Sequence, residues 1–285
     1  MNNGIIKYPS VSVVIPCFNG EKYIAKTINS VLHQHYPEIE IIIVNDGSKD
    51  STYEILKSYE NTTIRIINKP NTGVSDSRNI GMGYAGGAYI LFLDADDILE
   101  PDFISKRVEL LEKDTSLSYC TGEIVWINEL DNPIEMPKKQ YGIYENITRN
   151  VASFNPLFST CPSAYLFRME VVKRKKLQFN IRLSSPADRY FLLELGNEKG
   201  ALVKDGGKLM YRINTYSMSH HFSEKLIFDQ ENYFFSVIKN NLVSGNEKVI
   251  FIKKMCYQLF ASFYRLKMYS PSFVYLSRYL KSFFL

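Results

Sequence analysis

The sequence has few cysteines and no long apolar run, and both absences narrow the classes of protein to which it can belong. Its four cysteines are scattered without C-x-x-C spacing, at Cys17, Cys120, Cys161 and Cys256. This usage excludes a disulfide framework and a zinc site built on cysteine pairs. No uninterrupted apolar stretch reaches the roughly 18 residues of a membrane-spanning helix, and the polar amino terminus does not resemble a signal peptide. We therefore expect a cytoplasmic protein with reduced thiols.

Acidic and basic residues nearly cancel over the whole chain, but they are unevenly distributed. The formal net charge is +4 over 285 residues, and 45% of the residues are hydrophobic, enough for a sizeable core. Residues 225–285 carry nine basic and three acidic residues, a net charge of +6, which leaves residues 1–224 at −2. The basic character therefore belongs to the C-terminal segment and not to the rest of the chain.

Short apolar runs alternate with segments of helical spacing up to about residue 100. The runs are rich in β-branched residues and cover residues 11–15, 39–44, 64–67 and 89–93. Between them, apolar residues recur at helical spacing at Ile24, Ile28, Val31 and Leu32, and again at Tyr53, Leu56 and Tyr59. Near-continuous apolar strands that alternate with helices predict an α/β fold, in which helices flank both faces of a mostly parallel sheet.

Each of the four apolar runs ends in a loop rich in Gly, Asn and Asp. These loops cover residues 16–20, 45–50, 71–81 and 94–97. The carboxyl ends of parallel strands meet at one edge of a sheet, and open α/β sheets bind their ligands at that edge. The sequence therefore predicts a nucleotide site there.

The acidic loop Asp94-Ala95-Asp96-Asp97 follows the fourth run directly and contains a D-x-D motif. Carboxylates at a strand end can hold a hard divalent cation, and that cation can hold a diphosphate. The alternative interpretation is a polar turn in which Asp97 caps a helix that starts at Ile98. The other three loops favour the first interpretation.

Three residues of the other loops also have two interpretations each. Asp46 can accept a hydrogen bond from the imide N–H of uracil, or it can simply stand in an Asp-Gly turn. Pro16 can support the base, or it can terminate a strand. Arg78 can bind a phosphate through two N–H groups, or it can pair with Asp76 or with the acidic loop.

In combination, the four loops resemble those of the family 2 inverting glycosyltransferases, which have the nucleotide-diphospho-sugar (GT-A) fold. The matching segments are Val14-Ile15-Pro16-Cys17-Phe18-Asn19, Val44-Asn45-Asp46-Gly47-Ser48-Lys49-Asp50, Gly73-Val74-Ser75-Asp76-Ser77-Arg78-Asn79-Ile80-Gly81 and Asp94-Ala95-Asp96-Asp97. The resemblance implies a donor site formed by Pro16, Phe18, Asn19, Asp46, Arg78, Asp94 and Asp96. Pro16 and Asp46 would contact the nucleobase, Asp94 would lie near the ribose, and Asp96 would bind the Mn²⁺ or Mg²⁺ that bridges the diphosphate.

The resemblance also implies a general base in the second half of the chain. The family uses the Asp of a Glu-Asp pair that opens a helix, and the matching residue here is Asp188. Ser185 is expected as the N-cap of this helix, with Pro186 at its first position. The alternative is that Asp188 only stabilises the helix, through the favourable interaction of an acidic residue with the N-terminal end of the helix dipole. Ala187 departs from the family, which usually has Glu at this position.

A second departure concerns histidine. Family members often have Tyr-Arg-x-His, whereas this chain has Tyr211-Arg212-Ile213-Asn214 and then His220-His221. Either His220 or His221 would reach the metal or the diphosphate if that loop folded over the donor. A solvated pair on the loop is the alternative.

The basic C-terminal segment reads as two amphipathic helices. One stripe consists of Phe251, Ile252, Met255, Leu259, Ser262 and Phe263, and after a break at Pro271 a second consists of Phe273, Leu276, Tyr279, Leu280 and Phe283. These helices pack on the rest of the chain or on a second copy, or they lie on the inner face of the cell membrane with Lys and Arg toward anionic lipid. Nucleic acid is not expected as a partner, because no motif for it is present.

The sequence therefore predicts a GT-A glycosyltransferase domain over residues 1–224, with a nucleotide-binding half (1–100) and an acceptor half (101–224), and a helical extension over 225–285. The expected activity is metal-dependent, inverting transfer from a UDP-sugar to a glycan or lipid-linked glycan in surface polysaccharide synthesis. The alternative is a catalytically inactive GT-A-like protein that binds nucleotide sugars or acts as a scaffold. A nucleotidyltransferase is disfavoured, because Cys17-Phe18-Asn19-Gly20 lacks the Gly-rich phosphate loop with a Lys or Arg.

Overall fold

The computed structural model describes residues 8–135, 142–144, 146–202, 207–213 and 223–282. The chain divides into two compact units that are interleaved in sequence. The first unit comprises Met1–Tyr144, Cys161–Lys176 and Lys199–Ile213, and the second comprises Glu145–Thr160, Leu177–Glu198 and Asn214–Leu285. The second unit thus takes segments from both sides of residue 224. The division into residues 1–224 and 225–285 remains a prediction.

The first unit is built on an eight-stranded sheet. Its strands follow the order β3 (Ile64–Asn68), β2 (Ile39–Asn45), β1 (Val11–Cys17), β4 (Tyr89–Phe92), β10 (Tyr165–Arg168), β6 (Tyr119–Thr121), β11 (Gly200–Leu202) and β9 (Gly142–Tyr144). The first four strands are all parallel, as predicted from their apolar runs. Beyond β4 the sheet is mixed, because β10 runs antiparallel to both of its neighbours.

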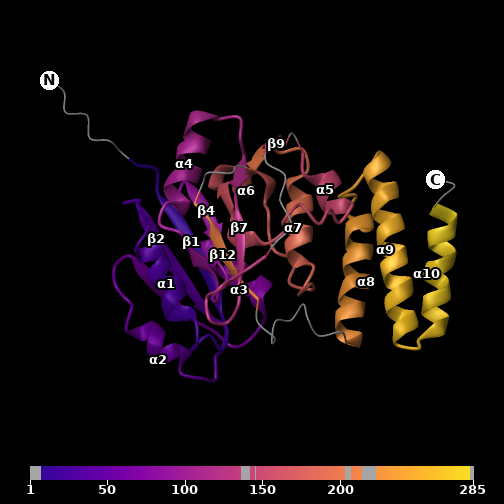
Figure 1. The fold of residues 1–285 in the computed structure, drawn as a ribbon, viewed down its shortest axis with the longest axis horizontal. Helices are drawn as coiled ribbons and strands as arrows, with labels where there is room; N and C mark the ends of the chain where they lie inside the picture. The colour runs from indigo at the N-terminus through magenta and orange to yellow at the C-terminus, as the bar shows by residue number, and fades with distance from the viewer. Residues whose placement is uncertain (1–7, 136–141, 145, 203–206, 214–222, 283–285) are drawn as a thin grey trace. The chain divides into compact units, whose positions relative to one another are not determined.

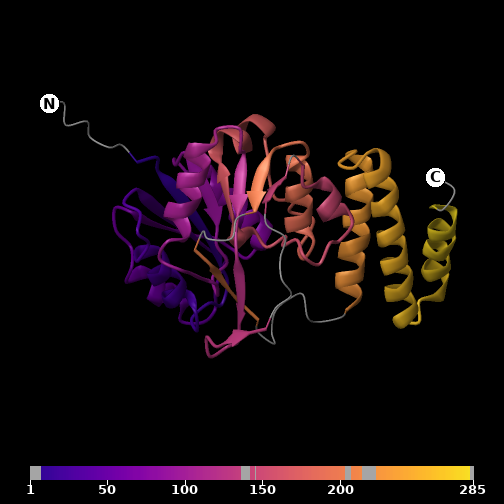
Figure 2. The same cartoon turned by 45° about the horizontal axis from the view of Figure 1, so that its top comes forward.

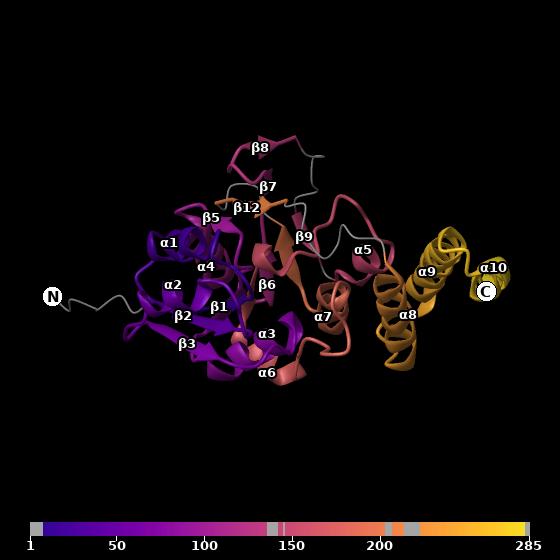
Figure 3. The same cartoon turned by 90° about the horizontal axis from the view of Figure 1, so that it is seen from below.

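A smaller sheet and five α-helices complete the described part of the first unit. The small sheet has the order β5 (Ile98–Leu99), β12 (Leu209–Arg212), β7 (Ile124–Ile127) and β8 (Pro133–Ile134). The helices are α1 (Ile24–Leu32), α2 (Thr52–Lys57), α3 (Val74–Tyr84), α4 (Phe103–Lys113) and α6 (Met169–Lys175). Figure 3 shows α1 and α4 on one side of the large sheet and α3 and α6 on the other. The predicted flanking of both faces is confirmed.

The strands carry apolar residues on both faces because helices cover both sides of the large sheet. Every residue of β1 is buried, as expected for a parallel strand between two helical layers. Helix α3 lies so close to β1 that a Cβ at Gly81 would stand 2.3 Å from Cγ1 of Val14. Glycine is therefore required at residue 81 for this approach. The helical stripe predicted before β2 is largely confirmed, since Ile24, Ile28 and Val31 are buried, but Leu32 is 49% exposed.

The second unit is helical. It contains α5 (Thr148–Ala152), α7 (Ala187–Leu195), α8 (Glu224–Lys239), α9 (Gly245–Arg265) and α10 (Tyr269–Lys281). Figures 1 and 2 show α8, α9 and α10, coloured orange to yellow, side by side. Phe251 of α9 joins them to the rest of this unit, because its ring stacks on Phe154 at 6.5 Å and meets Tyr233 of α8 edge-on at 5.6 Å. Within the described residues, every helix falls short of the length and apolarity needed to cross a membrane.

The predicted stripe of α9 is confirmed at Phe251, Met255, Leu259 and Phe263, all of which are buried. The prediction of which face of the last helix is buried was wrong. Helix α10 buries Ser272 and Tyr275 and leaves Phe273 59% and Leu280 54% exposed. Phe283 lies outside the described residues.

The physical reason for this phase is a pair of contacts with α9. The ring of Tyr275 stacks on that of Phe263 at 5.8 Å, and the hydroxyl of Ser272 donates to the carbonyl of Phe260 at 3.1 Å. The helix break was also misplaced, because α9 ends at Arg265 and α10 already contains Pro271 in its first turn. Proline is tolerated there because its missing N–H would have no helical partner.

Candidate functional site

The strand order of the first unit defines where a ligand is expected. The chain builds β1, β2 and β3 outward in one direction and then returns to place β4 on the other side of β1. This reversal is a topological switch point, and open α/β sheets bind ligands outside the carboxyl ends of the strands at that point. The loops after β1 and β4 flank it, and those after β2 and β3 extend the same edge.

The loop after β1 is tied to the loop after β2 by hydrogen bonds. The N–H of Asn19 donates to Oγ of Ser48 at 3.0 Å, and Oδ1 of Asn19 accepts from the N–H of Lys49 at 2.9 Å. Asn19 adopts a positive φ of 49°, a conformation that asparagine tolerates better than most residues. Asn19 thus organises the two loops, and Phe18 beside it is 48% exposed. Their contacts with a donor remain predictions.

Pro16 lies inside β1 and does not simply terminate it. The carbonyl of Val14 accepts from the N–H of Leu93 at 2.9 Å. The backbone polar groups of Val14, and by the alternation of the strand those of Pro16, therefore point toward the β4 side. The pairing of β1 with β4 ends at Val14. The missing N–H of Pro16 is therefore on the side where β1 no longer has a paired strand, while β2 still pairs with β1 on the other side, and this is why an interior strand accepts proline here.

Asp46 lies just past the end of β2 and is 3% exposed. Its Oδ1 accepts from the N–H of Thr72 and its Oδ2 from the N–H of Gly73, both at 2.9 Å. Its carboxylate also pairs with the ammonium of Lys69, which reaches Asp76 at 3.1 Å as well. Lys69 was not predicted from the sequence, because only the fold brings this lysine between two acidic residues.

Asp76 is held in its charged form by this network. A hydrogen bond from the Thr72 hydroxyl, followed by the contact with Lys69, lowers the pKa of Asp76 below its ordinary value. The N-terminus of α3, where Gly73 is the N-cap, therefore holds two carboxylates and one ammonium.

Arg78 and Asp94 form an ion pair at 2.6 Å in which Arg78 is 3% exposed. This contact was one of the two interpretations of Arg78, and its role toward a phosphate remains a prediction. The side chain of Asp94 is 28% exposed. The N–H of Asp94 donates to Oγ of Ser163 at 3.0 Å, which fixes the start of the acidic loop.

Asp97 is fully buried and does not cap a helix. The short strand β5 follows it, and the next helix, α4, has Asp102 at its N-cap. The Oδ1 of Asp97 accepts from the N–H of Arg212 at 3.0 Å, and the carbonyl of Asp96 accepts from Nε of the same arginine at 2.9 Å. Burial, and then the charges of Asp96 and Asp94, raise the pKa of Asp97 well above its ordinary value.

One group of side chains in the described part of the chain could hold a metal ion. It consists of Asp94, Asp97 and Cys161, whose ligand atoms all lie within 4.8 Å of one another. Oδ2 of Asp97 is buried without a hydrogen bond of regular geometry, although the side chain of Ser163 is close enough to lower the pKa of Asp97. The oxygen and sulfur atoms of this group are of the types that bind cations. Asp96 does not belong to this group, and its assignment as the metal ligand remains a prediction. Cys161 was not predicted to lie near the acidic loop, because more than sixty residues of sequence separate them.

Asp188 belongs to the second unit, where it lies in the first turn of α7 and is partly exposed. The helix begins at Ala187 with Pro186 at the N-cap, one residue later than predicted. The segment before it is fixed by Asp229 of α8, whose carboxylate accepts from the N–H of Ser185 at 3.0 Å. Asp229 thus orders the start of α7, a role that no local sequence pattern indicates. The role of Asp188 as a base remains a prediction.

Ala187, at the position where the family usually has Glu, is fully buried. Its side chain therefore has no contact with solvent. Asn214, His220 and His221 lie outside the described residues.

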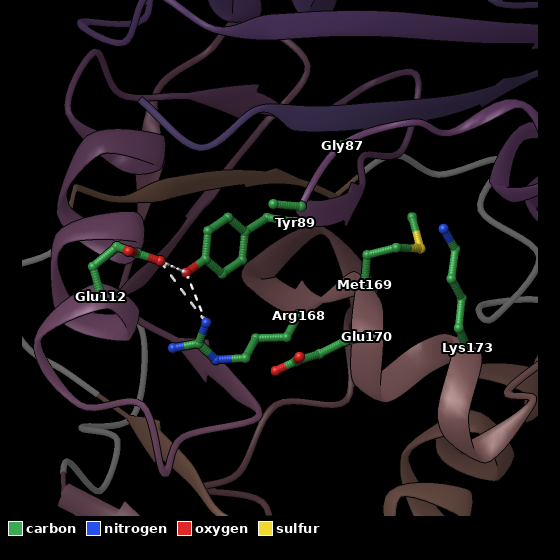
Figure 4. Close-up of a pocket in the computed structure, with 8 residues that line it drawn as sticks. Gly87, Tyr89, Glu112, Arg168, Met169, Glu170 and Lys173 are labelled. Atoms are coloured by element: carbon green, nitrogen blue, oxygen red, sulfur yellow. Dashed lines mark hydrogen bonds and ion pairs between the residues drawn. The ribbon is translucent and has the colours of Figure 1, made fainter. Parts of the chain in front are cut away.

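A cavity of about 330 Å³ lies at the amino end of β4, at the opposite end of this strand from the acidic loop (Figure 4). Inside it, Nη1 of Arg168 donates to the hydroxyl of Tyr89 at 3.0 Å and lies 3.8 Å from Oε1 of Glu112. The Tyr89 hydroxyl in turn donates to Glu112. Because these side chains satisfy one another, we assign the cavity to the packing of β4, β10 and α4.

Comparisons with known proteins identify a family and relatives that this chain resembles. A family model described as Glycosyl transferase family 2 matches residues 12–174, more than half of the chain. An uncharacterized glycosyltransferase of Haemophilus influenzae is 33% identical over 212 residues, which span 69% of this chain and 65% of that protein. The chondroitin synthase of Pasteurella multocida is 40% identical over 125 residues, but these span only 42% of this chain and 13% of that enzyme.

Solved structures share the fold. The crystal structure of S. aureus TarS 1-349 in complex with UDP-GlcNAc has a TM-score of 0.68 at 17% identity, covering 95% of this chain and 92% of that chain. The same protein in complex with UDP has a TM-score of 0.63 at 19% identity. The predicted fold class is confirmed by this likeness.

Proposed function

The chain belongs to glycosyl transferase family 2, and on this basis we propose that it transfers a sugar from a UDP-sugar to a glycan or lipid-linked glycan in surface polysaccharide synthesis. The observation that carries the proposal is the set of buried polar side chains at the switch point of the sheet. Asp46 after β2, Arg78 on α3 and Asp97 between β4 and β5 are each at most 3% exposed. Burying such groups is unfavourable unless they are paired and hydrogen-bonded, and a charged ligand at this edge would add to the partners that they have.

Two likenesses support the choice of donor and product. The similar TarS structures bind UDP-GlcNAc and UDP. The relatives that match only part of this chain include a chondroitin synthase and a hyaluronan synthase of Pasteurella multocida. Both observations are consistent with a uracil nucleotide whose imide N–H donates to Asp46.

The proposed reaction is a single displacement with inversion at the anomeric carbon. The acceptor oxygen forms a bond to that carbon while the bond from the carbon to the diphosphate oxygen breaks. The acceptor hydroxyl gives its proton to the carboxylate of Asp188, and the nucleoside diphosphate leaves. Arg78 contributes positive charge on the donor side of the site.

A divalent cation would be held by Asp96 and by the oxygens of the diphosphate, with Asp94 close by. When bound, Mn²⁺ or Mg²⁺ would supply charge stabilisation for the leaving diphosphate. Asp46, Arg78 and Lys69 bind and orient the nucleotide irrespective of the ion.

The C-terminal helices are proposed to contact the inner face of the cell membrane. Phe273 and Leu280 are exposed on α10, together with Val274 at 48%, and Lys281 lies in the last turn of the same helix. An exposed apolar face bordered by basic residues matches the surface of an anionic bilayer. A lipid-linked acceptor would place the reaction at the same surface.

The proposal is tested by incubating the full-length protein with a panel of nucleotide sugars and Mn²⁺ and measuring the release of nucleoside diphosphate. We expect slow hydrolysis of one UDP-sugar, and faster release when a suitable acceptor is added. Binding of UDP without any turnover would instead support the inactive, nucleotide-sugar-binding alternative. Absence of both binding and turnover would refute the proposal.

A further inference from the structure

The turn that leads into α7, the helix of Asp188, is bound by one carboxylate of the neighbouring helix α8. Oδ2 of Asp229 on α8 accepts from the N–H of Ser185 at 3.0 Å and from the hydroxyl of Ser184 at 2.9 Å. The N–H of Ser184 lies 3.1 and 3.2 Å from the two oxygens of the same carboxylate. Asp229 is only 8% exposed. Hydrogen bonds to a charged acceptor are stronger than neutral ones, so this carboxylate fixes the backbone directly before α7.

A second contact, from the other end of α8, holds the first residues of α7 itself. Asn240, the C-cap of α8, donates from Nδ2 to the hydroxyl of Tyr190 at 2.5 Å. The guanidinium of Arg189 lies over the ring of Phe154, 4.4 Å from its centre. The two residues that follow Asp188 are therefore held by other elements of the second unit, while Asp188 itself is partly exposed.

The place at which α7 begins decides where its first side chains point. Pro186 is the N-cap of α7 and has no N–H, so Asp229 binds the two N–H groups that come before it. A slip of the helix by one residue would turn each side chain by about 100° around the axis. A general base must lie within hydrogen-bond reach of the proton that it takes, and a misplacement of about 1 Å can lower a rate by about 10²-fold. A base on the first turn of α7 therefore needs a fixed helix start.

We propose that Asp229 is a positioning residue for sugar transfer, which holds the start of α7 so that the carboxylate of Asp188 faces the acceptor hydroxyl. Asp229 takes no proton and acts only through the hydrogen bonds to Ser184 and Ser185. The proposal rests on the role of Asp188 in the proposed function. It makes α8, which lies in the segment predicted as an extension over residues 225–285, part of the arrangement that carries out the reaction.

The test measures sugar transfer by the full-length protein at saturating donor and acceptor. Asp229→Ala should lower kcat by about 10²-fold. The KM for the UDP-sugar should stay unchanged, because the residues assigned to the donor belong to the first unit. Asp229→Asn should lose less, because its amide oxygen can replace Oδ2 as the acceptor for Ser184 and Ser185. A wild-type kcat in Asp229→Ala, or a fall in kcat that is matched by a rise in KM for the donor, would overturn the proposal.

A double variant shows whether Asp229 acts through Asp188. Once Asp188→Asn has removed the base, its misplacement has no further consequence, so adding Asp229→Ala should slow transfer little more. Residues that act as one unit are non-additive in this way, whereas independent sites add. A purely structural role would slow the double variant by the same factor as the wild type, and that result would overturn the proposal. If Asp229→Ala does not fold, the same comparison with Asp229→Asn decides the question.

Glu231→Gln is the matched control on α8. The carboxylate of Glu231 accepts from the hydroxyl of Tyr275 on α10 and not from the turn before α7. This variant should keep kcat, and a loss as large as that of Asp229→Ala would overturn the specific role of Asp229.

Asp188→Asn separates this proposal from the proposed function. A slow Asp188→Asn variant together with a fully active Asp229→Ala variant would reject the positioning role and leave the proposed base intact. A wild-type rate in Asp188→Asn would instead reject the proposed base, and the positioning role with it.

Discussion

The strand-end loops of the first unit and the C-terminal helices of the second treat polar and apolar side chains in opposite ways. At this edge of the first unit, charged residues are inside: Asp46, Asp97 and Arg78 of α3 are at most 3% exposed. The helices bury some aromatic residues, such as Phe251 and Tyr275, but leave others outside, and Tyr257 and Phe273 are 57% and 59% exposed. Each region thus contains exceptions to the usual rule that apolar groups are buried and charges are solvated.

The difference indicates the size of the partner that each region serves. Buried charges need fixed, close partners, so the loops are suited to a small, charged ligand that makes several directed hydrogen bonds. Exposed apolar side chains on one helix are suited to a large surface that needs no such geometry.

The largest effect is expected from removal of the metal or of Asp96. Excess EDTA should reduce sugar transfer to background, and Mn²⁺ should restore it, because the leaving diphosphate would otherwise carry uncompensated charge. Asp96→Ala should abolish transfer in the same assay and weaken donor binding. Asp102→Ala is the control, since this aspartate has a side chain that is 55% exposed at the N-cap of α4. Full activity in EDTA would contradict the metal assignment.

Asp188→Asn should lower the transfer rate by about 10²–10⁴-fold, because the amide keeps the shape of the side chain but cannot accept the acceptor's proton. UDP affinity should be unchanged, since the residue is assigned to the acceptor. Glu194→Gln, on the same helix α7, should retain activity. If the Asn variant were as fast as the wild type and the Gln variant were slow, Glu194 would take the role of the base.

Lys69→Met should destabilise the first unit, because it leaves the nearly buried carboxylate of Asp46 without its cation. The side chains of Lys69 and Asp46 are 10% and 5% exposed, and breaking such a pair typically lowers the free energy of unfolding by about 3 kcal/mol or more. Urea unfolding measures the change. Lys49→Met, which alters an exposed lysine in the loop after β2, should leave stability nearly unchanged.

Asp46→Ala should remove discrimination between nucleobases. In the wild type, UDP should compete well and CDP poorly for the donor site, because cytosine lacks the imide N–H that Asp46 accepts. Loss of this bond should weaken UDP by about 10- to 100-fold and leave CDP nearly unchanged. Equal inhibition of the wild type by UDP and CDP would refute the assigned role.

The smallest effects are expected on the exposed side of the comparison. Phe273→Ser with Leu280→Ser should reduce sedimentation with anionic vesicles, and Lys281→Gln should weaken it by about 1 kcal/mol, an effect that salt should mask. Leu130→Ser, which alters a leucine that is 78% exposed in the first unit, is the control. If the wild type did not bind vesicles, the proposed membrane contact of α10 would be rejected and the assignment of the donor site would stand.

Point substitutions are preferable to removal of the tail. Phe251 of α9 is fully buried against Phe154 and Tyr233, so a chain ending near residue 244 would expose the core of the second unit. Loss of vesicle binding in such a chain would then report unfolding and not the loss of a surface.

Local sequence patterns were enough to predict the parallel half of the sheet and the loops that carry Asp46 and the acidic residues. Each of these features depends on neighbours in the sequence: apolar runs form strands, and polar residues at their ends meet at one edge. The loop predicted over residues 71–81 was wrong in its second part, because the chain is helical from Val74 and Arg78 lies on α3. The phase of α10 was not predictable in this way. Its apolar residues occur on more than one face, and the contacts of Tyr275 with Phe263 and of Ser272 with Phe260 decided which face was buried.

The sequence by itself determined the family, the alternation of strands and helices, and the residue types at the strand ends, because these follow from short-range patterns. Only the tertiary structure decided that Lys69 lies between Asp46 and Asp76, that Arg212 bonds Asp97, that Asp229 fixes the start of α7 and that Cys161 joins the acidic loop. Most of these contacts join residues far apart in the chain. Their existence depends on strand order and helix packing, which no local pattern encodes.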